Sequence, residues 1–182
     1  MEINVSQLLK GTIGAVRNYD IDETIDIEGC AYDVYGAVAL MRTDDGILVT
    51  GKLTTEAALT CSRCLNSFEC PLTLQLEEEY LPTIDVNSGT ALPAPEEPGT
   101  FTIDEHNVLD LSEAVRQYTL LAQPMKPLCK PDCAGLCPTC GANLNQAKCD
   151  CPPQPADPRW AALRDLIAKD SESQSKNLKG RK

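Results

Sequence analysis

Six of the ten cysteines in this chain lie within one 23-residue stretch, and two more form a separate Cys-x2-Cys pair. These eight residues are Cys61, Cys64, Cys129, Cys133, Cys137, Cys140, Cys149 and Cys151. A structural zinc ion takes four thiolates in a tetrahedron, and a Cys-x2-Cys turn can aim two sulfurs at one metal. The spacing therefore predicts two structural zinc ions.

Disulfides and a redox-active dithiol are the alternatives to zinc. Disulfides need an oxidising compartment, but the opening residues lack the pattern of a signal peptide, and no later segment approaches the roughly 18 apolar residues of a membrane span. We therefore expect a cytoplasmic protein with no membrane association and with reduced thiols. A thioredoxin-like dithiol belongs to a strand-helix-strand unit, whereas Cys61 and Cys64 stand between two strand patterns.

Sequence leaves two groupings of the thiols open. One joins Cys137, Cys140, Cys149 and Cys151, and leaves Cys61, Cys64, Cys129 and Cys133 together. The other joins Cys61, Cys64, Cys137 and Cys140, and leaves Cys129, Cys133, Cys149 and Cys151 together. The first is favoured because its local loop is short and closes at a smaller entropic cost. Cys30 and Cys70 are left over and are expected to be small core or surface residues.

The chain lacks the residues on which metalloenzymes, hydrolases and nucleotide-hydrolysing enzymes depend. Its only histidine, His106, falls in a polar stretch and is expected to be solvated. Catalytic zinc sites keep an open position and mostly use histidine, whereas four-thiolate sites are closed. No nucleophile elbow or phosphate-binding glycine loop is present. We therefore expect no enzyme, with a thiol redox enzyme as the less favoured alternative.

The net charge of the chain limits the kinds of partner that it can bind. The formal net charge is −11, and because each four-thiolate zinc site adds −2, the metal-loaded protein would carry about −15. A surface of this sign repels the phosphate backbone of nucleic acids and attracts basic proteins.

Apolar alternation predicts an antiparallel sheet. Residues 24–28, 34–40, 47–59 and 68–80 have strand patterns, after a short helix at 5–9. Asp45 and Gly46 form a hairpin signature, so the flanking strands should be antiparallel neighbours. The predicted fold class is α+β, with a sheet curled toward a barrel from about residue 21 to 81, flanking helices and a C-terminal cysteine-rich zinc module.

A proline-rich segment follows the predicted sheet. Residues 82–100 hold four prolines and two adjacent glutamates, which indicates a loop or linker. A short strand at 101–103 should follow. Asp110 and Glu113 look like a capping box. The helix they start should end before Pro124, with one apolar face formed by Leu111, Val115, Tyr118 and either Leu120 or Leu121.

The chain is thus divided into four segments. Residues 1–81 form a helix plus an antiparallel strand domain, and 82–100 a Pro-rich acidic loop. Residues 101–169 hold a helix, the zinc module and a terminal helix that begins at Asp157. Residues 170–182 form a disordered tail.

Several motifs together resemble the YceD family, the large ribosomal RNA subunit accumulation proteins of bacteria and plastids. They are the segments Cys61–Leu65, Leu111–Arg116, Pro124–Asn145, Cys149–Cys151 and Asp157–Trp160. The resemblance covers nearly the whole chain to Leu166, and its most specific part is Pro124–Asn145. It implies a non-enzymatic factor needed for normal levels of large-subunit ribosomal RNA, often encoded beside a small basic ribosomal protein. Zinc is not implied by the resemblance and depends on the cysteines alone.

Charge and resemblance combine in one hypothesis. An acidic protein that affects ribosomal RNA could hold a basic large-subunit ribosomal protein, or dock on a pre-ribosomal particle. Direct RNA binding is the rival. Its candidate residues are Arg63, Lys176, Lys179, Arg181 and Lys182.

Overall fold

The computed structural model describes residues 1–27, 29–93, 95, 98–152 and 159. The chain divides into two compact units, Met1–Cys133 and Ala134–Lys182. The first unit extends past the predicted 1–81 segment, because strands and a helix beyond the proline-rich loop pair with or pack on the earlier elements. The terminal helix predicted from Asp157 and the tail predicted at 170–182 lie outside the described residues.

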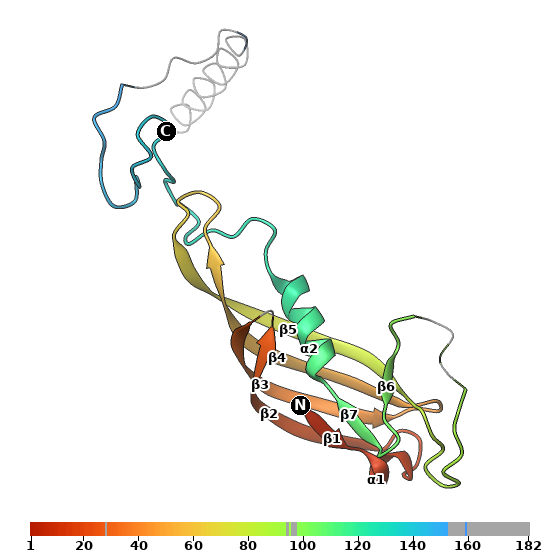
Figure 1. Ribbon diagram of the computed structural model, residues 1–182. Helices are drawn as coiled ribbons and strands as arrows, with labels where there is room; N and C mark the ends of the chain where they lie inside the picture. Colours follow the sequence, from red (N-terminus) through yellow and green to blue (C-terminus); the bar gives the residue numbers. More distant parts are fainter. Residues whose placement is uncertain (28, 94, 96–97, 153–158, 160–182) are drawn as a thin grey trace, which may run out of the picture. The chain divides into compact units, whose positions relative to one another are not determined.

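A five-stranded curled sheet dominates the first unit (Figure 1). Its strands, in spatial order, are β2 (Val16–Ile27), β3 (Cys30–Arg42), β4 (Ile47–Thr60), β5 (Ser67–Pro82) and β6 (Phe101–Ile103). The first four are antiparallel neighbours, as predicted, and β6 joins β5 in parallel. Between β5 and β6 the described residues contain one isolated bridge, Ile84 with Ala91. A parallel neighbour needs such a long connection.

The sheet curls because its two long hairpins separate. Pairing between β3 and β4 ends at Tyr35 and Thr54, while β4 and β5 continue to pair as far as Thr60 and Ser67. Gly36 lies beside the point of separation with a φ of 148°. A Cβ atom there would sit 2.3 Å from the Lys52 carbonyl oxygen, so only glycine fits. The predicted barrel-like curl is therefore confirmed as a half-barrel.

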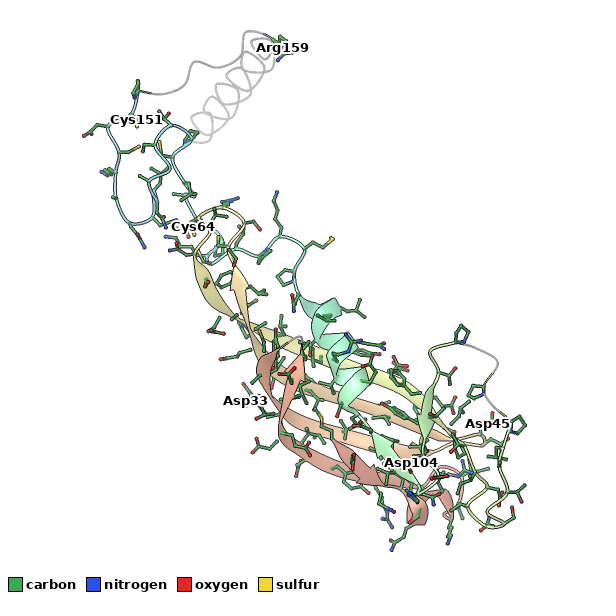
Figure 2. All side chains as sticks on the ribbon, in the orientation of Figure 1. Asp33, Asp45, Cys64, Asp104, Cys151 and Arg159 are labelled. Atoms are coloured by element: carbon green, nitrogen blue, oxygen red, sulfur yellow. The ribbon has the colours of Figure 1, made fainter. Side chains whose placement is uncertain are left out.

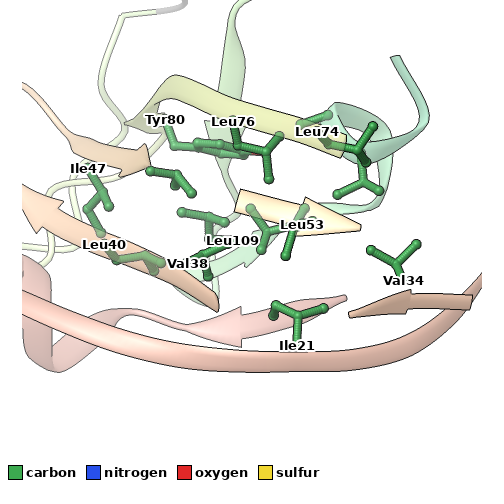
Figure 3. Packing of buried hydrophobic residues seen from close by; sticks show 14 of the residues in the cluster. Ile21, Val34, Val38, Leu40, Ile47, Leu53, Leu74, Leu76, Tyr80 and Leu109 are labelled. Carbon is green, nitrogen blue, oxygen red and sulfur yellow. The ribbon is translucent and has the colours of Figure 1, made fainter. Parts of the chain in front are cut away.

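The core fills the concave face of this half-barrel (Figure 3). Alternate residues of the long strands point inward, among them Val38, Leu53 and Leu74. The face is covered by α1 (Ser6–Leu9), α2 (Ser112–Ala122) and a small ribbon in which β1 (Glu2–Asn4) pairs with β7 (Val108–Asp110). Each fully buried large apolar side chain contributes about 1.5–3 kcal/mol.

Two expectations about strand and helix starts were wrong. Strand β2 begins at Val16, earlier than the alternation indicated, because polar Arg17 and Asn18 pair through their backbones with β3 at the sheet edge. The capping box at α2 is also absent. Asp110 accepts from the Ser112 amide at 2.9 Å and from its hydroxyl at 2.6 Å, whereas the Glu113 carboxylate binds Arg116.

The inner face of α2 contains the predicted residues, because Leu111 and Val115 are buried and Tyr118 packs against the core. Ala114, Val115 and Thr119 are buried, and the helix ends at Ala122, before Pro124 as expected. Leu121 is 81% exposed, since an α-helix turns it about 120° away from Val115. Leu120 packs partly against the core instead. Among the described residues no helix is long and apolar enough to cross a membrane.

Candidate metal centres

The first cysteine cluster, site A, consists of Cys61, Cys64, Cys129 and Cys133. Cys61 and Cys64 lie in the turn that joins β4 to β5, and Figure 2 labels Cys64 at the tip of that hairpin. Cys129 and Cys133 come from the segment that follows α2. All four sulfur atoms lie within 4.8 Å of one another. Site A thus belongs entirely to the first unit.

Backbone hydrogen bonds shape the hairpin tip of site A. The Cys61 amide donates to the Asn66 carbonyl at 2.9 Å, and the Leu65 amide donates to the Cys61 carbonyl at 3.0 Å. This tight turn holds Leu65 in the left-handed region, with a φ of 59°. A non-glycine residue rarely adopts that conformation, so the surrounding bonds must enforce it.

Two further bonds join the tip to the segment after α2. The Ser62 amide donates to the Pro127 carbonyl at 2.8 Å. The Arg63 guanidinium donates to the Cys133 carbonyl at 2.9 Å. The sequence indicated Arg63 as a solvated surface residue or a candidate for RNA binding, and its position between two paired cysteines was the available signal for this bracing role.

The spacing of the sulfur atoms fits a four-thiolate metal site. Cys61 and Cys133 have sulfurs 3.8 Å apart, and those of Cys64 and Cys129 are 3.6 Å apart. A regular tetrahedron with metal–sulfur distances of about 2.3 Å has edges of about 3.8 Å. All ten cysteines are free thiols in this structure. Three of the four ligands are buried, and Cys129 is half-buried, so the centre would be closed to solvent.

Two thiols of site A have pKa values that are shifted in opposite directions. Backbone N–H donors, first that of Cys129 and then those of Cys64 and Arg63, lower the pKa of Cys61 to about 6. Burial, together with the neighbouring thiols, raises the pKa of Cys129 to about 12. One thiolate forms readily, and further negative charge in the same cluster is disfavoured. A divalent cation would remove that repulsion, as metal binding to thiolates generally does.

The second cluster, site B, consists of Cys137, Cys140, Cys149 and Cys151 and lies in the second unit. Its sulfur atoms also fall within 4.8 Å of one another. Cys137 and Cys140 sit in a tight turn in which the Cys137 amide donates to the Ala142 carbonyl at 2.8 Å, and the Gly141 amide donates to the Cys137 carbonyl at 2.9 Å. Gly141 has a φ of 73°, which explains the glycine after the second cysteine.

Asparagines support the loop between the two halves of site B. The Asn143 side-chain oxygen accepts from the Asn145 amide at 3.0 Å, and the Asn145 side-chain oxygen accepts from the Ala134 amide at 2.9 Å. The Thr139 amide lies 3.4 Å from the Cys137 sulfur and donates to it. Sequence reasoning did not single out these asparagines, and nothing in their spacing indicated the role.

Two thiols of site B also have pKa values that are shifted in opposite directions, and the site is more exposed. Backbone N–H groups of Cys140 and then Thr139 lower the pKa of Cys137 to about 6. A hydrogen bond with the Cys140 thiol, followed by burial, raises the pKa of Cys151 to about 12. Cys137 is buried, Cys140 is exposed, and Cys149 and Cys151 are half-buried. Reagents in solution can therefore reach site B more readily than site A.

The structure brings the eight thiols together in the first of the two groupings considered from sequence. Cys30 is exposed and Cys70 is half-buried, and neither belongs to a cluster. The side chain of His106 is 78% exposed, lies 3.8 Å from the Glu105 carboxylate and belongs to neither cluster. The expectation of a solvated histidine is confirmed.

Comparisons with known proteins find a matching family model and several relatives. The family model described as large ribosomal RNA subunit accumulation protein YceD matches residues 49–167. An uncharacterized protein of Mycobacterium tuberculosis is 31% identical over 129 residues, which cover 71% of this chain and 59% of the relative. An uncharacterized protein of Mycobacterium leprae is 28% identical over 126 residues, covering 69% of this chain and 55% of the relative. This chain thus spans little more than half the length of these relatives.

A plant relative carries a functional name. The large ribosomal RNA subunit accumulation protein YCED homolog 1, chloroplastic, of Arabidopsis thaliana is 36% identical over 58 residues, which cover 32% of this chain and 18% of the relative. No solved structure matches the chain. The match of the family model over most of the chain, including all eight clustered cysteines, shows that this protein belongs to the YceD family.

Proposed function

We propose that this protein is a non-enzymatic, zinc-stabilised factor that supports accumulation of large-subunit ribosomal RNA and assembly of the large subunit through a basic protein partner. The observation that carries the proposal is membership of the YceD family, whose model and plant relatives are named for accumulation of that RNA. The chain spans only part of its mycobacterial relatives, so the biological role is inferred from the family.

Zinc is the metal that the two clusters suit best. Four thiolates and no carboxylate or histidine form a soft ligand set, which favours zinc over magnesium, calcium or manganese. Cys61, Cys64, Cys129 and Cys133 would hold one ion, and Cys137, Cys140, Cys149 and Cys151 the other. Such an ion contributes binding free energy to folding rather than chemistry to a substrate.

The same ligand sets support the non-enzymatic assignment. Four sulfurs complete a tetrahedral shell, so a bound zinc would have no open position for water or substrate. His106, the only histidine of the chain, is exposed and belongs to neither cluster. Zinc analysis with thiol titration tests this directly: two bound ions with eight protected thiols support a structural role, whereas metal-free, freely titrating thiols would favour a redox dithiol.

Charge supports a basic protein as the partner. Residues 1–133 contain 22 aspartates and glutamates against 8 lysines and arginines, a difference of −14. A field of this sign attracts lysine- and arginine-rich proteins and repels phosphates. Direct RNA binding has weaker support, since the Arg63 guanidinium is already bonded to the Cys133 carbonyl.

Depletion of the protein with gradient sedimentation tests the role. We expect a lower ratio of large- to small-subunit ribosomal RNA, and co-sedimentation of the tagged chain with large-subunit precursors. The double variant Cys61→Ser, Cys64→Ser should fail to restore the ratio, while the matched variant Cys30→Ser, Cys70→Ser restores it. An unchanged RNA ratio after depletion would contradict the proposed role.

Affinity purification with and without RNase tests the kind of partner. Retention of a basic large-subunit protein after RNase treatment would support a protein partner. Loss of every ribosomal component after RNase, together with tight binding of purified RNA fragments, would favour the RNA-binding alternative.

A further inference from the structure

The convex face of the sheet is open. Its side chains alternate with those of the core along β2 to β5 and point away from it. Asp20 and Asp22 on β2 and Glu77 and Glu79 on β5 are exposed. We call these four residues the acidic rims, because they border the two sides of the central strands β3 and β4.

The acidic rims are not neutralised by their neighbours. Across the strands, Asp20 pairs with Ala37, Asp22 with Tyr35, Glu77 with Thr50 and Glu79 with Leu48. Within the described part of the chain none of the four carboxylates makes an ion pair. Glu79 accepts one neutral hydrogen bond, from the Thr43 hydroxyl at 2.7 Å. The charge of this face is therefore available to a partner.

Between the rims, β3 presents a strip of small and apolar side chains that Leu48 of β4 extends, while β4 also presents Thr50, Thr54 and Lys52, the last directly across from Ala37. We call the apolar strip the central strip, and it consists of Tyr35, Ala37, Ala39, Met41 and Leu48. Tyr35 is 47% exposed and Ala37 is also exposed. Lys52 is the one basic residue of β3 or β4 on this face among the described residues. A strip that contains alanines allows another backbone to approach closely, and aromatic residues such as Tyr35 are favoured at interfaces.

The dimensions suit a helix. Strands β2 and β5 are three strand spacings apart, so the two rims are separated by about 14 Å across the strands. In the register of the sheet Asp20 is level with Gln75 and Asp22 with Thr73, so the β2 rim is also displaced by about 13 Å along the strands from Glu77 and Glu79. An α-helix with its side chains is about 10–12 Å wide. A helix laid along the central strip would bring side chains on both of its flanks to the acidic rims.

We infer that the convex sheet face docks a lysine- and arginine-rich helix of a partner protein. Its basic flanks meet the acidic rims, and its small apolar side contacts the central strip. This inference rests on the proposed function, in which the partner is basic, and adds the surface that binds it and the form in which the partner is bound.

Binding of a designed peptide to matched variants of the full-length protein tests the surface. The probe is a helical peptide of about 20 residues, or about 30 Å, long enough to reach from Asp22 to Glu79, with lysines on two flanks and alanines along the side between them. The rim variant is Asp20→Asn, Asp22→Asn, Glu77→Gln. The control variant, Asp44→Asn, Asp45→Asn, Glu105→Gln, removes the same charge from exposed positions outside this face.

Fluorescence anisotropy should separate the two variants. The rim variant should weaken binding about eightfold, roughly twofold for each lost surface charge pair, and the control variant less than about twofold. Ala37→Gln leaves the charge unchanged but obstructs the central strip, and should weaken binding of the helical peptide about threefold without affecting poly-lysine. Equal losses of affinity in the rim and control variants would contradict the proposed docking surface.

The same variants separate failure of the surface from failure of the proposed function. Large-subunit precursors that bind the rim and control variants equally would leave the proposed function standing and refute the docking face. If the precursors bind neither the variants nor the unchanged protein, the proposal of a basic partner is contradicted, and the docking face is contradicted with it.

Discussion

Replacing Cys64 with serine should destabilise the first unit much more than replacing Cys140 destabilises any part of the chain. Cys64 belongs to site A, which joins the β4–β5 hairpin to the segment after α2. Cys140 belongs to site B, whose four ligands are close in sequence. Both effects are expected in the zinc-loaded protein of the proposed function.

The difference follows from the lengths of chain that the two sites close. In site A, Cys64 meets Cys129, 65 residues further along the chain. If a metal link restricts the unfolded chain as a disulfide does, a loop of that length is worth about 4 kcal/mol. The shortest link across site B, from Cys140 to Cys149, closes only about nine residues and is worth about 2.5 kcal/mol. A loss of about 4 kcal/mol should lower the Tm of a unit of this size by about 15 °C.

Calorimetry with hydrogen exchange measures both effects. Cys64→Ser should lower the main transition and reduce protection along β4 and β5. Cys140→Ser should leave the main transition within about 2 °C and reduce protection only in residues 134–152. Cys70→Ser, a half-buried thiol outside both clusters, is the control and should change little. Equal shifts for Cys64→Ser and Cys140→Ser would refute the reasoning from loop length.

Three further outcomes are expected. Elemental analysis of protein purified without added metal should find about two zinc ions per chain, and less than about one would contradict the two-site proposal. Burial raises the pKa of Tyr80 well above its usual range. The neutral Tyr80 side chain therefore contributes fully to the free energy of unfolding below about pH 10, and this contribution is lost as the pH rises further. The Tyr80 hydroxyl has no hydrogen-bond partner among the described residues. Urea unfolding at pH 7 and pH 11 tests this with Tyr80→Phe. At pH 7 the variant should be as stable as the unchanged protein or up to about 1 kcal/mol more stable, and between pH 7 and pH 11 its free energy of unfolding should fall less. A large loss of stability at pH 7 would show that the Tyr80 hydroxyl has a hydrogen-bond partner. Gly36→Ala should destabilise the sheet by more than about 2 kcal/mol in the same assay, because its Cβ would meet the Lys52 carbonyl. A loss below about 0.5 kcal/mol would show that the strands can move apart there.

The long strands were predictable because a sheet with one buried face imposes alternation on sequence. Leu72, Leu74 and Leu76 alternate on β5, and all three are buried. The pairing of β1 with β7 was not predictable. Three-residue strands show no periodicity, and the register of Ile3 with Leu109 depends on tertiary packing across more than 100 residues. The parallel pairing of β6 likewise depends on where the long loop returns the chain.

The ligand candidates were also predictable, since Cys-x2-Cys spacing is local. From sequence, the entropy of loop closure was the only reason to prefer one grouping of the ligands over the other. In the structure, site A forms because the hairpin tip meets the segment after α2, where the Ser62 amide bonds the Pro127 carbonyl. That contact is non-local, and no spacing rule could give it. Arg63 illustrates the same limit, because its partner is a backbone carbonyl 70 residues away.

The position of site A at the end of a two-stranded ribbon determines how metal loss would spread. Beyond Thr54, strand β4 pairs only with β5, through about six residue pairs or roughly 20 Å. A two-stranded hairpin is only marginally stable by itself. Chelation should therefore open the ribbon progressively from the tip toward Thr54 before the sheet unfolds. The opened strands would present unpaired backbone edges, which are templates for association with other copies of the chain. If the sites hold zinc, as proposed, zinc starvation would then cause aggregation of protein whose half-barrel is still folded.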